Sequence, residues 1–292
     1  MVAGVPITHP NRVVYPEPRI TKARVAQYYA SIAAHILPHL RERPAVMVRC
    51  PEGLDHECFY QKHAGAGTPR SLRRVRIREK AKSADYLVIE DAAGLVRLIQ
   101  FGVLEIHTWN ARASTLEAPD RLVFDLDPGP DVSWPAVRDA ARLVQSSLEA
   151  RGLKSFVKTT GGKGLHVVTP IQRGPSWSAC VEFARDVTET LVTERPDGFT
   201  ATMAKIARKG KIFIDYFRNQ RGATSVAAYS TRARPGAPVS VPLTWTELDR
   251  VPAGSHFSID VVERRLARLK ADPWAGYARL SQSLPAARGR GR

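Results

Sequence analysis

The chain has 292 residues, 43% of them hydrophobic, with 44 Lys or Arg against 28 Asp or Glu and a formal net charge of +16. This length fits one large domain or two small ones with a buried core, and no apolar run approaches the ~20 residues that span a bilayer, so we expect neither a membrane span nor a signal peptide. The charge favours a polyanionic partner, with nucleic acid ahead of a membrane, although a basic protein from an arginine-rich proteome has the same composition.

The first part of the chain is predicted to mix helices with short strands. Residues 1–20 are rich in proline, which favours an extended surface arm. Thr21 is placed to cap a helix over 22–37, and Asp91 to cap another that ends near Gln100. Strands are expected at 45–49, 58–62, 86–90 and 103–107. The segment 70–82 holds seven Lys or Arg and one Glu.

The second part continues with longer elements. A strand at 121–128 precedes a helix capped by Ser133, and a strand, a glycine turn and a second strand occupy 155–169. An amphipathic helix begins near Trp177. The remaining predictions are strands at 211–217 and 224–230 with a hairpin-like connection, helices at 244–250, 258–271 and 273–280, and a disordered basic tail at 281–292. Because hairpins and crossovers both occur, the predicted class is α+β with largely antiparallel sheets.

The three cysteines bear on the compartment. Cys50, Cys58 and Cys180 are too few and too scattered for a disulfide framework, so we expect a reducing cytoplasm. Two of them lie near histidines, but the spacing matches no common zinc finger.

Asp125 and Asp127 are the strongest chemical signal. Side chains on a strand alternate between its faces, so these two carboxylates share a face that is opposite to Leu122, Phe124 and Leu126. Carboxylates at this spacing repel each other unless a cation lies between them, and their oxygens suit Mg²⁺ or Mn²⁺. A D-x-D pattern alone is a weak signal, because phosphatases, glycosyltransferases and plain surface strands contain it.

Asp215 is a third acid, set within an apolar strand. A carboxylate in such surroundings needs a partner that offsets its desolvation. One interpretation is a buried ion pair with Arg218 or Arg221. The other is a two-metal site shared with Asp125 and Asp127, in which ions ~3.5–4 Å apart clamp the attacking and leaving oxygens of a phosphoryl transfer. Spacing alone leaves both open.

The stretch 158–166 is a glycine-rich loop around a lysine. It is not a Walker A loop, because Gly164 stands where Ser or Thr is required. Its glycines let backbone N–H groups approach a polyphosphate, while Thr160 can donate a hydrogen bond and Lys163 supplies charge. His166 is placed to contact a phosphate or the ribose. The alternative is a tight hairpin with a solvated lysine.

Several other side chains are weaker signals. Phe59 and Tyr60, followed by a lysine, form a pattern suited to stacking on nucleobases, although alternation favours one of the two facing the core. His107 is more often structural when judged alone. Arg232 follows a strand and can reach a triphosphate, but taken alone it is a surface arginine.

In their order along the chain, the stretches 122–128, 158–166 and 213–216 resemble the three motifs of archaeo-eukaryotic primase-type polymerases. Within these, the sequence is most similar to the polymerase domain of bacterial ligase D, an end-joining repair enzyme. Further similarities fall at 15–16, 43–45, 59–64, 105–110 and 228–234. The resemblance covers about residues 5–280 and implies a primase-polymerase domain over 1–280, with an N-terminal lobe at about 1–115 and a catalytic core at about 116–280.

The resemblance implies a template-dependent nucleotidyltransferase of bacterial cytoplasm and nucleoid. It would add ribonucleotides, and less readily deoxyribonucleotides, to DNA 3′ ends during gap filling and end processing in non-homologous end joining. Two Mn²⁺ or Mg²⁺ ions would be its cofactors and an NTP or dNTP its substrate. Its partners would be DNA with breaks, gaps or 5′-phosphate ends, together with a Ku-type protein and ligase or nuclease modules. The chain is then a stand-alone version or one domain of a longer protein.

The resemblance also assigns roles to residues. Asp125, Asp127 and Asp215 would hold the metals. The incoming nucleotide would be held by Thr160, Gly162, Lys163, His166, Arg232, His107, Arg49 and Arg218. Arg12 and Lys22 would recognise a downstream 5′-phosphate, and Phe59 and Tyr60 would lie near the template. Thr160, Arg12 and Tyr60 depart from the usual Ser, Lys and Phe, and because the change to Arg12 alters its geometry, 5′-phosphate recognition is the least direct inference.

Two other functions stay open on the sequence. A metal-dependent phosphohydrolase or nuclease shares the acid cluster, although it has no need of a triphosphate loop. The positive charge alone is sufficient for a non-catalytic DNA-end-bridging module, but this function does not explain the three acids.

Overall fold

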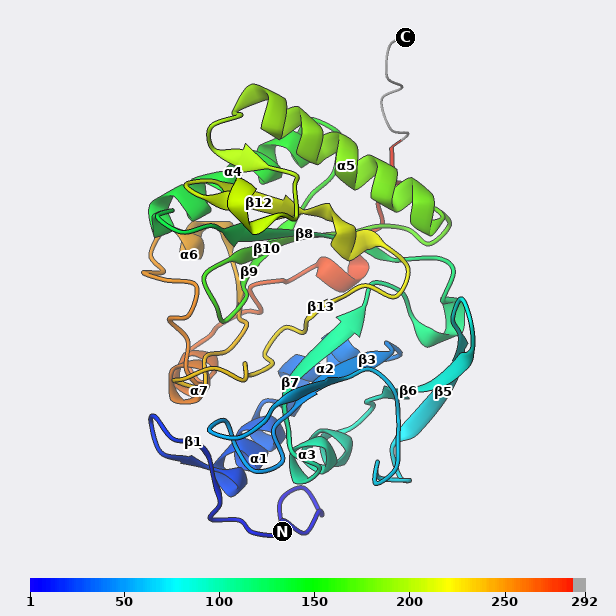
Figure 1. Ribbon diagram of the computed structural model, residues 1–292, viewed down its shortest axis with the longest axis vertical. Coiled ribbons are helices and arrows are strands. Elements are labelled where there is room, and N and C mark those ends of the chain that lie inside the picture. The colour runs from blue at the N-terminus through cyan, green and yellow to red at the C-terminus, as the bar shows by residue number, and fades with distance from the viewer. Residues whose placement is uncertain (286–292) are drawn as a thin grey trace. The chain divides into compact units, whose positions relative to one another are not determined.

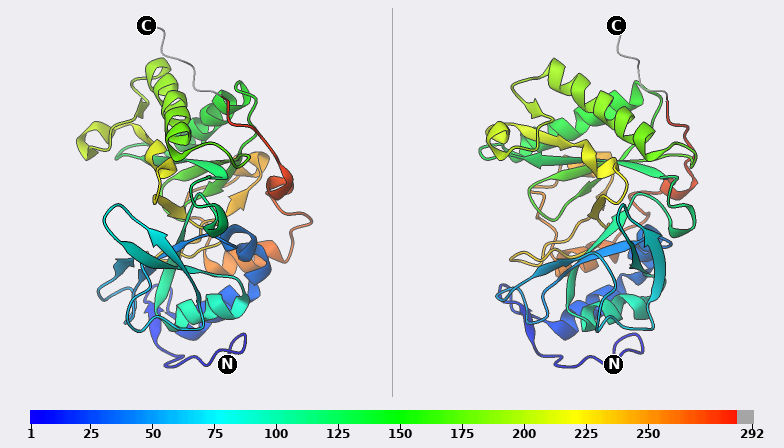
Figure 2. Two further views of the ribbon diagram at one scale, coloured as in Figure 1. Left: turned by 90° about the vertical axis from the view of Figure 1, so that its right-hand side faces the viewer. Right: turned by 45° about the vertical axis from the view of Figure 1, so that its right-hand side comes forward.

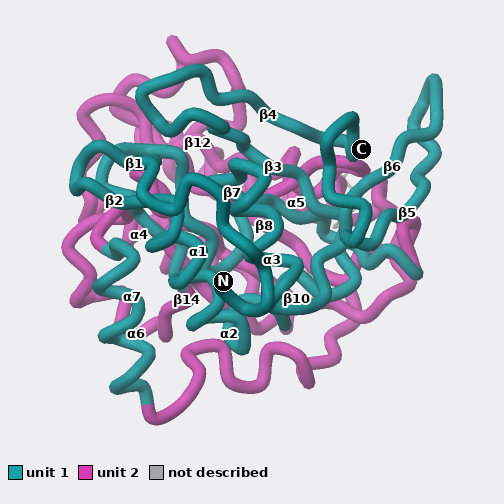
Figure 3. The backbone as a smooth tube through the Cα atoms, turned by 90° about the horizontal axis from the view of Figure 1, so that it is seen from below, with its two compact units in different colours: residues 1–114, 226–241, 257–269 teal, residues 115–225, 242–256, 270–292 magenta. Residues whose placement is uncertain are grey.

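A computed structural model describes residues 1–285 (Figures 1 and 2). The chain divides into two compact units (Figure 3). The first comprises residues 1–114, 226–241 and 257–269, and the second comprises residues 115–225, 242–256 and 270–292. Residues 286–292 of the predicted tail lie outside the described residues. No helix in the described part is long and apolar enough to cross a membrane.

The first unit is built on an antiparallel sheet whose strands lie in the order β7-β3-β6-β5, with β4 also paired to β3. Its helix α1 packs against α3, and α3 against β7 (Figure 1). The elements are β1 (Val13–Tyr15), β2 (Ile20–Thr21), α1 (Lys22–Ser31), α2 (Ala33–Leu40), β3 (Ala45–Arg49), β4 (Phe59–Gln61), β5 (Arg73–Arg78), β6 (Ser83–Val88), α3 (Ala92–Gln100), β7 (Val103–Trp109) and α7 (Ile259–Leu266). The short helix η1 (Ala113–Thr115) lies where the chain passes into the second unit.

The second unit is built on a sheet in the order β11-β12-β8-β10-β9-β14, antiparallel except for the β11–β12 pair. Helices α4 and α5 pack on the sheet at β8 (Figures 1 and 2). The elements are β8 (Arg121–Pro128), α4 (Trp134–Glu149), β9 (Phe156–Thr159), β10 (Leu165–Pro170), α5 (Trp177–Glu194), β11 (Phe199–Thr200), η2 (Lys205–Arg208), β12 (Ile212–Asp215), η3 (Tyr216–Asn219), β14 (Pro242–Leu243), α6 (Trp245–Leu248) and η4 (Tyr277–Arg279). Strand β13 (Thr224–Val226) lies where the chain returns to the first unit.

The predicted helix starts are confirmed, because Thr21, Asp91 and Ser133 each accept a hydrogen bond from a backbone N–H in the first turn. Mixed, mostly antiparallel sheets with flanking helices confirm the α+β class. The single helix predicted over 22–37 is wrong, since it breaks at Ile32 into α1 and α2.

Two further expectations are corrected. Residues 1–20 do not form a plain surface arm, because β1 and β2 pair and Tyr15 is completely buried. The hairpin predicted to follow 211–217 is also wrong, since β12 pairs with β8 and β11 instead. A pattern of alternating apolar residues identifies a strand but leaves its partner undetermined.

Candidate active site

The acid face of the second sheet is set by the register of two strands. Asp125 and Asp127 both belong to β8, and Asp215 lies directly opposite Asp125 in the antiparallel pairing with β12. The side chains of Asp125 and Asp215 are 14% and 13% exposed, whereas that of Asp127 is 54% exposed. Two of the three acids are therefore desolvated neighbours, and the third opens toward solvent.

Arg218 lies between the two buried acids. Its Nε atom is 3.0 Å from Oδ2 of Asp125 and 3.1 Å from Oδ2 of Asp215. Burial raises the pKa of Asp125, but the His166 ring and the Arg218 guanidinium outweigh it and hold the pKa below its usual value. The pKa of Asp215 is raised, chiefly by burial and further by Asp125, against the opposing effect of Arg218. One guanidinium thus supplies the positive charge that this acid pair requires.

Arg208 supplies the corresponding charge for Asp127. Its Nη1 atom lies 2.6 Å from Oδ2 of Asp127, and its guanidinium lies 4.1 Å from the centre of the Phe213 ring. Gly129 allows this approach, because a Cβ atom there would lie 1.7 Å from the carbonyl oxygen of Arg208. The glycine that ends the acid strand therefore lets the 205–208 turn come close to the acids.

The glycine-lysine loop joins β9 to β10 as a tight hairpin. The Thr160 hydroxyl donates to the Gly164 carbonyl oxygen and accepts from the N–H of Gly162. Gly161 has a positive φ of 68°, and a Cβ atom at Gly164 would lie 2.2 Å from the Leu126 carbonyl oxygen. Close backbone packing thus fixes the hairpin beside the acid strand.

A cavity of about 230 Å³ lies beside this hairpin. Lys163 and Gly162 line it together with Gly129, Asp131, Trp134 and Gly254. The Lys163 side chain is exposed, so its ammonium group is accessible to an anion. The loop is therefore a tight hairpin, as one of the two interpretations of the sequence predicted. Its Lys163 also lines a cavity that includes Gly129, the residue after β8.

His166 follows the hairpin on β10 and is 2% exposed. Its Nε2 atom is 3.4 Å from Oδ1 of Asp125, and its Nδ1 atom has no hydrogen-bond partner among the described residues. Burial, reinforced by nearby Lys158, lowers the pKa of His166 to about 3, so the ring is neutral at pH 7. His166 thus faces Asp125 with Nε2, and no described protein group accepts from or donates to its Nδ1 atom.

The carboxylate oxygens of Asp125, Asp127 and Asp215 could bind a metal ion, but in this structure they form ion pairs with Arg218 and Arg208. Within residues 1–285, no three His, Cys, Asp or Glu side chains are arranged to hold an ion as they stand. The arginine positions nevertheless show where positive charge is required, since Arg218 bridges two carboxylates and Arg208 holds the third. Oxygen donors from adjacent strands are the ligand type that Mg²⁺ and Mn²⁺ prefer, so the donor set fits such ions once the two guanidinium groups turn aside.

In the first unit, Glu105 joins two of the residues proposed to bind nucleotide. Its Oε1 atom is 2.7 Å from Nε2 of His107 and 2.9 Å from Nε of Arg232, and its Oε2 atom accepts from the N–H of Ala233. Burial raises the pKa of Glu105, but His107 and Arg232 lower it to about 2. The sequence places Glu105 two residues before His107 on the same strand, which is the pattern that identifies their shared face.

Arg49 also lies in the first unit, at the centre of a stack. Its guanidinium is 3.5 Å from the centre of the Phe101 ring and 5.2 Å from that of Phe59. Its Nε atom donates to the Phe101 carbonyl oxygen and Nη1 to Oε1 of Gln61. The resemblance assigns the Arg49 guanidinium to the nucleotide, but in this structure it hydrogen-bonds to Phe101 and Gln61.

Phe59 and Tyr60 are both accessible, at 41% and 56% exposed. The expectation that one of them faces the core is therefore wrong, because β4 is a short strand that pairs only with β3. The Tyr60 ring lies 5.9 Å from that of His107. Two exposed aromatic rings are available for stacking on bases.

Cys50 and Cys58 form a disulfide, so the expectation that the three cysteines are too scattered to pair is wrong for these two. The reason is the β3–β4 register, since Arg49 pairs with Phe59 and brings the two cysteines next to each other. The bridge closes the loop that leads to the exposed aromatic rings. Cys180 is a buried free thiol.

Arg12 and Lys22 are neighbours in the first unit. The N–H of Lys22 donates to the Arg12 carbonyl oxygen, and the Arg12 guanidinium pairs with Glu52 at 3.0 Å. Burial, and then the charge of Arg12, lower the pKa of Lys22. Glu52 neutralises only part of the charge of these two adjacent cations, so the pair suits the binding of an anion.

Comparison with known proteins supplies the family. The LigD primase-polymerase domain family matches residues 21–274. The multifunctional non-homologous end joining protein LigD of Pseudomonas aeruginosa is 41% identical over 286 residues, which make up 98% of this chain and 34% of that protein. LigD of Mycobacterium tuberculosis is 36% identical over 272 residues, 90% of this chain and 36% of that protein. The chain thus spans about a third of the length of these curated relatives.

A solved structure agrees with this match. The polymerase domain of Mycobacterium tuberculosis ligase D in complex with DNA is 34% identical, has a TM-score of 0.87, and covers 94% of this chain and 97% of that domain. The family match, the curated relatives and the solved structure agree with the two observed sheets. The chain belongs to the LigD primase-polymerase domain family, with the archaeo-eukaryotic primase fold, and is a nucleotidyltransferase of polymerase type.

Proposed function

We propose that the chain catalyses template-dependent nucleotidyl transfer, adding ribonucleotides, and less readily deoxyribonucleotides, to DNA 3′ ends. The role is gap filling and end processing during non-homologous end joining. The observation that carries this proposal is the cross-strand pair of Asp125 and Asp215, on the same sheet as Asp127 and next to the Lys163 hairpin. The relatives named for end joining and the solved domain in complex with DNA support the DNA substrate.

The three acids are proposed to hold two divalent ions, Mn²⁺ or Mg²⁺. Such ions, when bound, lower the pKa of a primer 3′-hydroxyl and neutralise the charge of a leaving pyrophosphate. The protein holds the carboxylates on adjacent rigid strands, and Arg218 and Arg208 release them. Burial of Asp125 and Asp215 keeps water away and strengthens the charge interactions there.

The hairpin is proposed to receive the nucleotide triphosphate. Lys163 provides a mobile positive charge at its cavity, and Thr160 with Gly162 holds the backbone shape of the loop. His166, neutral and buried beside Asp125, offers its unpartnered Nδ1 to the ligand. His107, Arg232, Arg49 and Arg218 stay predicted nucleotide contacts on the ground of the resemblance alone.

Arg12 and Lys22 are proposed to bind a 5′-phosphate at the downstream side of a gap. Their adjacency and the lowered pKa of Lys22 support an anion site. A gel-shift comparison of gapped duplexes tests this role, with 5′-phosphate expected to bind more tightly than 5′-hydroxyl. Equal binding of the two duplexes would show that Arg12 and Lys22 do not recognise a 5′-phosphate. Phe59 and Tyr60 are proposed to stack near the template.

The partners proposed are a Ku-type end-binding protein and ligase or nuclease modules. The matched relatives are named multifunctional and are about three times as long as this chain, which supports such modules acting beside it. Bacterial relatives also support a place of action on the bacterial chromosome.

One assay tests the proposal against its alternatives. The protein is incubated with a primed template, Mn²⁺ and one labelled NTP. Extension of the primer supports nucleotidyl transfer. Degradation of the strand would indicate a phosphohydrolase or nuclease, and a bound but unchanged strand would indicate an end-bridging module.

A further inference from the structure

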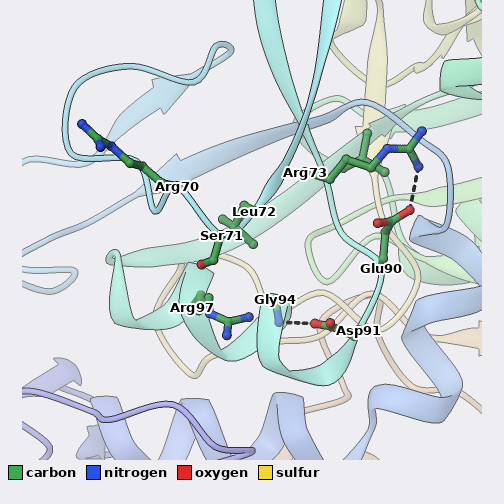
Figure 4. Close-up of a pocket in the computed structure, with 9 residues that line it drawn as sticks. Arg70, Ser71, Leu72, Arg73, Glu90, Asp91, Gly94 and Arg97 are labelled. Carbon is green, nitrogen blue, oxygen red and sulfur yellow. Dashed lines mark hydrogen bonds and ion pairs between the residues drawn. The ribbon is translucent and has the colours of Figure 1, made fainter.

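A second pocket lies in the first unit, and none of its lining residues is among the catalytic, nucleotide or DNA contacts proposed above. It is formed where β5 begins, β6 ends and α3 starts, and its cavity volume is about 230 Å³ (Figure 4). The polar residues that line it are Arg70, Ser71, Arg73, Glu90, Asp91 and Arg97. The pocket therefore contains three cations and two acids.

The acids of this pocket are already satisfied. Glu90 accepts from Nη1 of Arg73 at 2.6 Å, and Arg73 also pairs with Glu42. Asp91 caps α3 by accepting from the Gly94 N–H at 2.6 Å. Arg73 thus neutralises Glu90, and the Gly94 N–H holds the Asp91 carboxylate at the start of α3; the dashed lines in Figure 4 mark both contacts.

The other two cations and the hydroxyl are not satisfied. Within the described residues, the side chains of Arg70, Ser71 and Arg97 make no hydrogen bond and no ion pair. Arg97 is half-buried on α3, and in Figure 4 its side chain extends below Ser71 toward Gly94, while exposed Arg70 extends away from the other side chains. The half-buried guanidinium of Arg97, the Ser71 hydroxyl and the exposed guanidinium of Arg70 are therefore donors without an acceptor among the described residues.

We propose that this pocket binds a phosphate group. A phosphate oxygen pair matches the planar donors of Arg97, a third oxygen matches the Ser71 hydroxyl, and Arg70 can close over the group. A phosphate carries the negative charge that the unpaired arginines require, and a pocket of about 230 Å³ is large enough to hold one.

The strand next to the pocket indicates the source of the phosphate. Arg74, Arg76 and Arg78 are exposed and alternate along β5, so they share one face at ~7 Å intervals. Arg76 pairs with Asp85, but that contact is open to solvent and weak. A row of cations that leads from a phosphate pocket suits a nucleic-acid strand, and this step rests on the proposed function. The competing explanation is that charges on the edge strand β5 only prevent pairing with another sheet.

The first experiment uses the phosphate ion alone. The thermal midpoint of the full chain is measured in sodium phosphate and in sodium chloride of equal ionic strength. Phosphate is expected to raise the midpoint of the wild type and of R173Q, in which an exposed arginine of the second unit is replaced. It is expected to raise the midpoint of R97Q by less, because only the other proposed phosphate contacts remain in that variant.

The second experiment measures DNA binding against salt. Removal of one phosphate-binding cation reduces the slope of log K against log salt by about 0.7 for a single strand and about 0.9 for duplex. R97Q and R70Q are each expected to lower the slope by this amount whatever the DNA sequence, whereas R173Q leaves it unchanged. Primer extension at saturating DNA is expected to persist in all three variants, so a failure of the proposed polymerase activity is seen separately.

The outcomes separate the interpretations. A smaller phosphate effect in R97Q than in R173Q, together with a reduced slope, supports a nucleic-acid phosphate. A smaller phosphate effect with an unchanged slope supports the site but assigns it to a free phosphate or phosphate monoester. Wild-type behaviour of R97Q in both experiments would overturn the proposal and leave the edge-strand explanation.

Discussion

Asp215 lies directly opposite Asp125 across the β12–β8 pairing, and the Nε atom of Arg218 is 3.1 Å from the first carboxylate and 3.0 Å from the second. Strands that are ninety residues apart in the sequence thus bring two buried acids together, at a point where the protein supplies a cation of its own. The same place is where catalysis of nucleotidyl transfer would require positive charge.

Loss of this cation should destabilise the protein. R218Q leaves two neighbouring buried carboxylates without the guanidinium that they share. We expect the free energy of unfolding to fall by about 1–3 kcal/mol, less than for a fully buried pair because the arginine is 39% exposed. Urea unfolding in EDTA measures the fall. Added Mn²⁺ should narrow the difference from the wild type, because it replaces the missing charge.

The control for this variant is R221Q, which removes an exposed pair with Glu117. It should cost at most about 1 kcal/mol and respond to Mn²⁺ as the wild type does. If Mn²⁺ stabilises neither R218Q nor R221Q, the acids do not hold a metal ion. Equal stabilisation of both would show that the ion does not replace the charge of Arg218.

Release of Asp127 should strengthen metal binding. Arg208 pairs with this carboxylate at 2.6 Å and competes with an ion for it. R208Q is expected to bind Mn²⁺ up to about fivefold more tightly in the absence of DNA and nucleotide, the factor that corresponds to about 1 kcal/mol. Isothermal titration calorimetry measures the affinity, with K209Q as the neighbouring control. Weaker binding by R208Q would show that Arg208 does not compete.

Substitutions of Arg49 distinguish two roles for this residue, positioning of Phe59 and direct contact with the nucleotide. Its guanidinium lies between the Phe101 and Phe59 rings, which indicates that it positions Phe59. If Arg49 acts by positioning Phe59, R49K should behave like R49M, with a raised apparent KM for the primed template and an unchanged KM for NTP, because lysine keeps the charge but loses the planar stack. Steady-state kinetics with each substrate varied in turn measures both. A normal R49K beside an R49M with a raised KM for NTP would favour the direct nucleotide contact.

Glu105 should make stability depend on acidity. Its pKa in the folded protein is lowered to about 2, below the value near 4.3 of a free glutamate. Its stabilising effect is therefore complete above pH 4.3 and is lost as the pH falls toward 2. Over this range the wild type should lose up to about 1.4 kcal/mol per pH unit more than E105Q, measured by urea unfolding at each pH. Parallel curves for the two proteins would contradict the ion pairs with His107 and Arg232.

The helix starts at Thr21, Asp91 and Ser133 and the strand that carries Asp125 could be predicted from the sequence, because capping and alternation are local properties. The pairing of Asp215 with Asp125 could be proposed from the family motifs, but strand register depends on contacts between distant segments. The same holds for the disulfide of Cys50, which follows from the β3–β4 pairing.

The contact of Arg208 with Asp127 had no signal in the sequence. It depends on how closely two backbones approach at Gly129, and only the fold shows which carbonyl oxygen occupies the space of a side chain. Arg49 was assigned to the nucleotide by resemblance, while its stacking on Phe101 comes from a residue on a different element.

The most direct test of the catalytic centre compares the wild type with the double variant D125A/D127A in primer extension and in DNA binding. We predict that extension is abolished while the affinity for the primed template stays within about twofold of the wild type, because the arginines and aromatic rings that bind DNA remain. D139A, which removes an exposed acid of α4, should extend primers normally. Extension by D125A/D127A at the wild-type rate would contradict the assignment of this acid face as the catalytic centre.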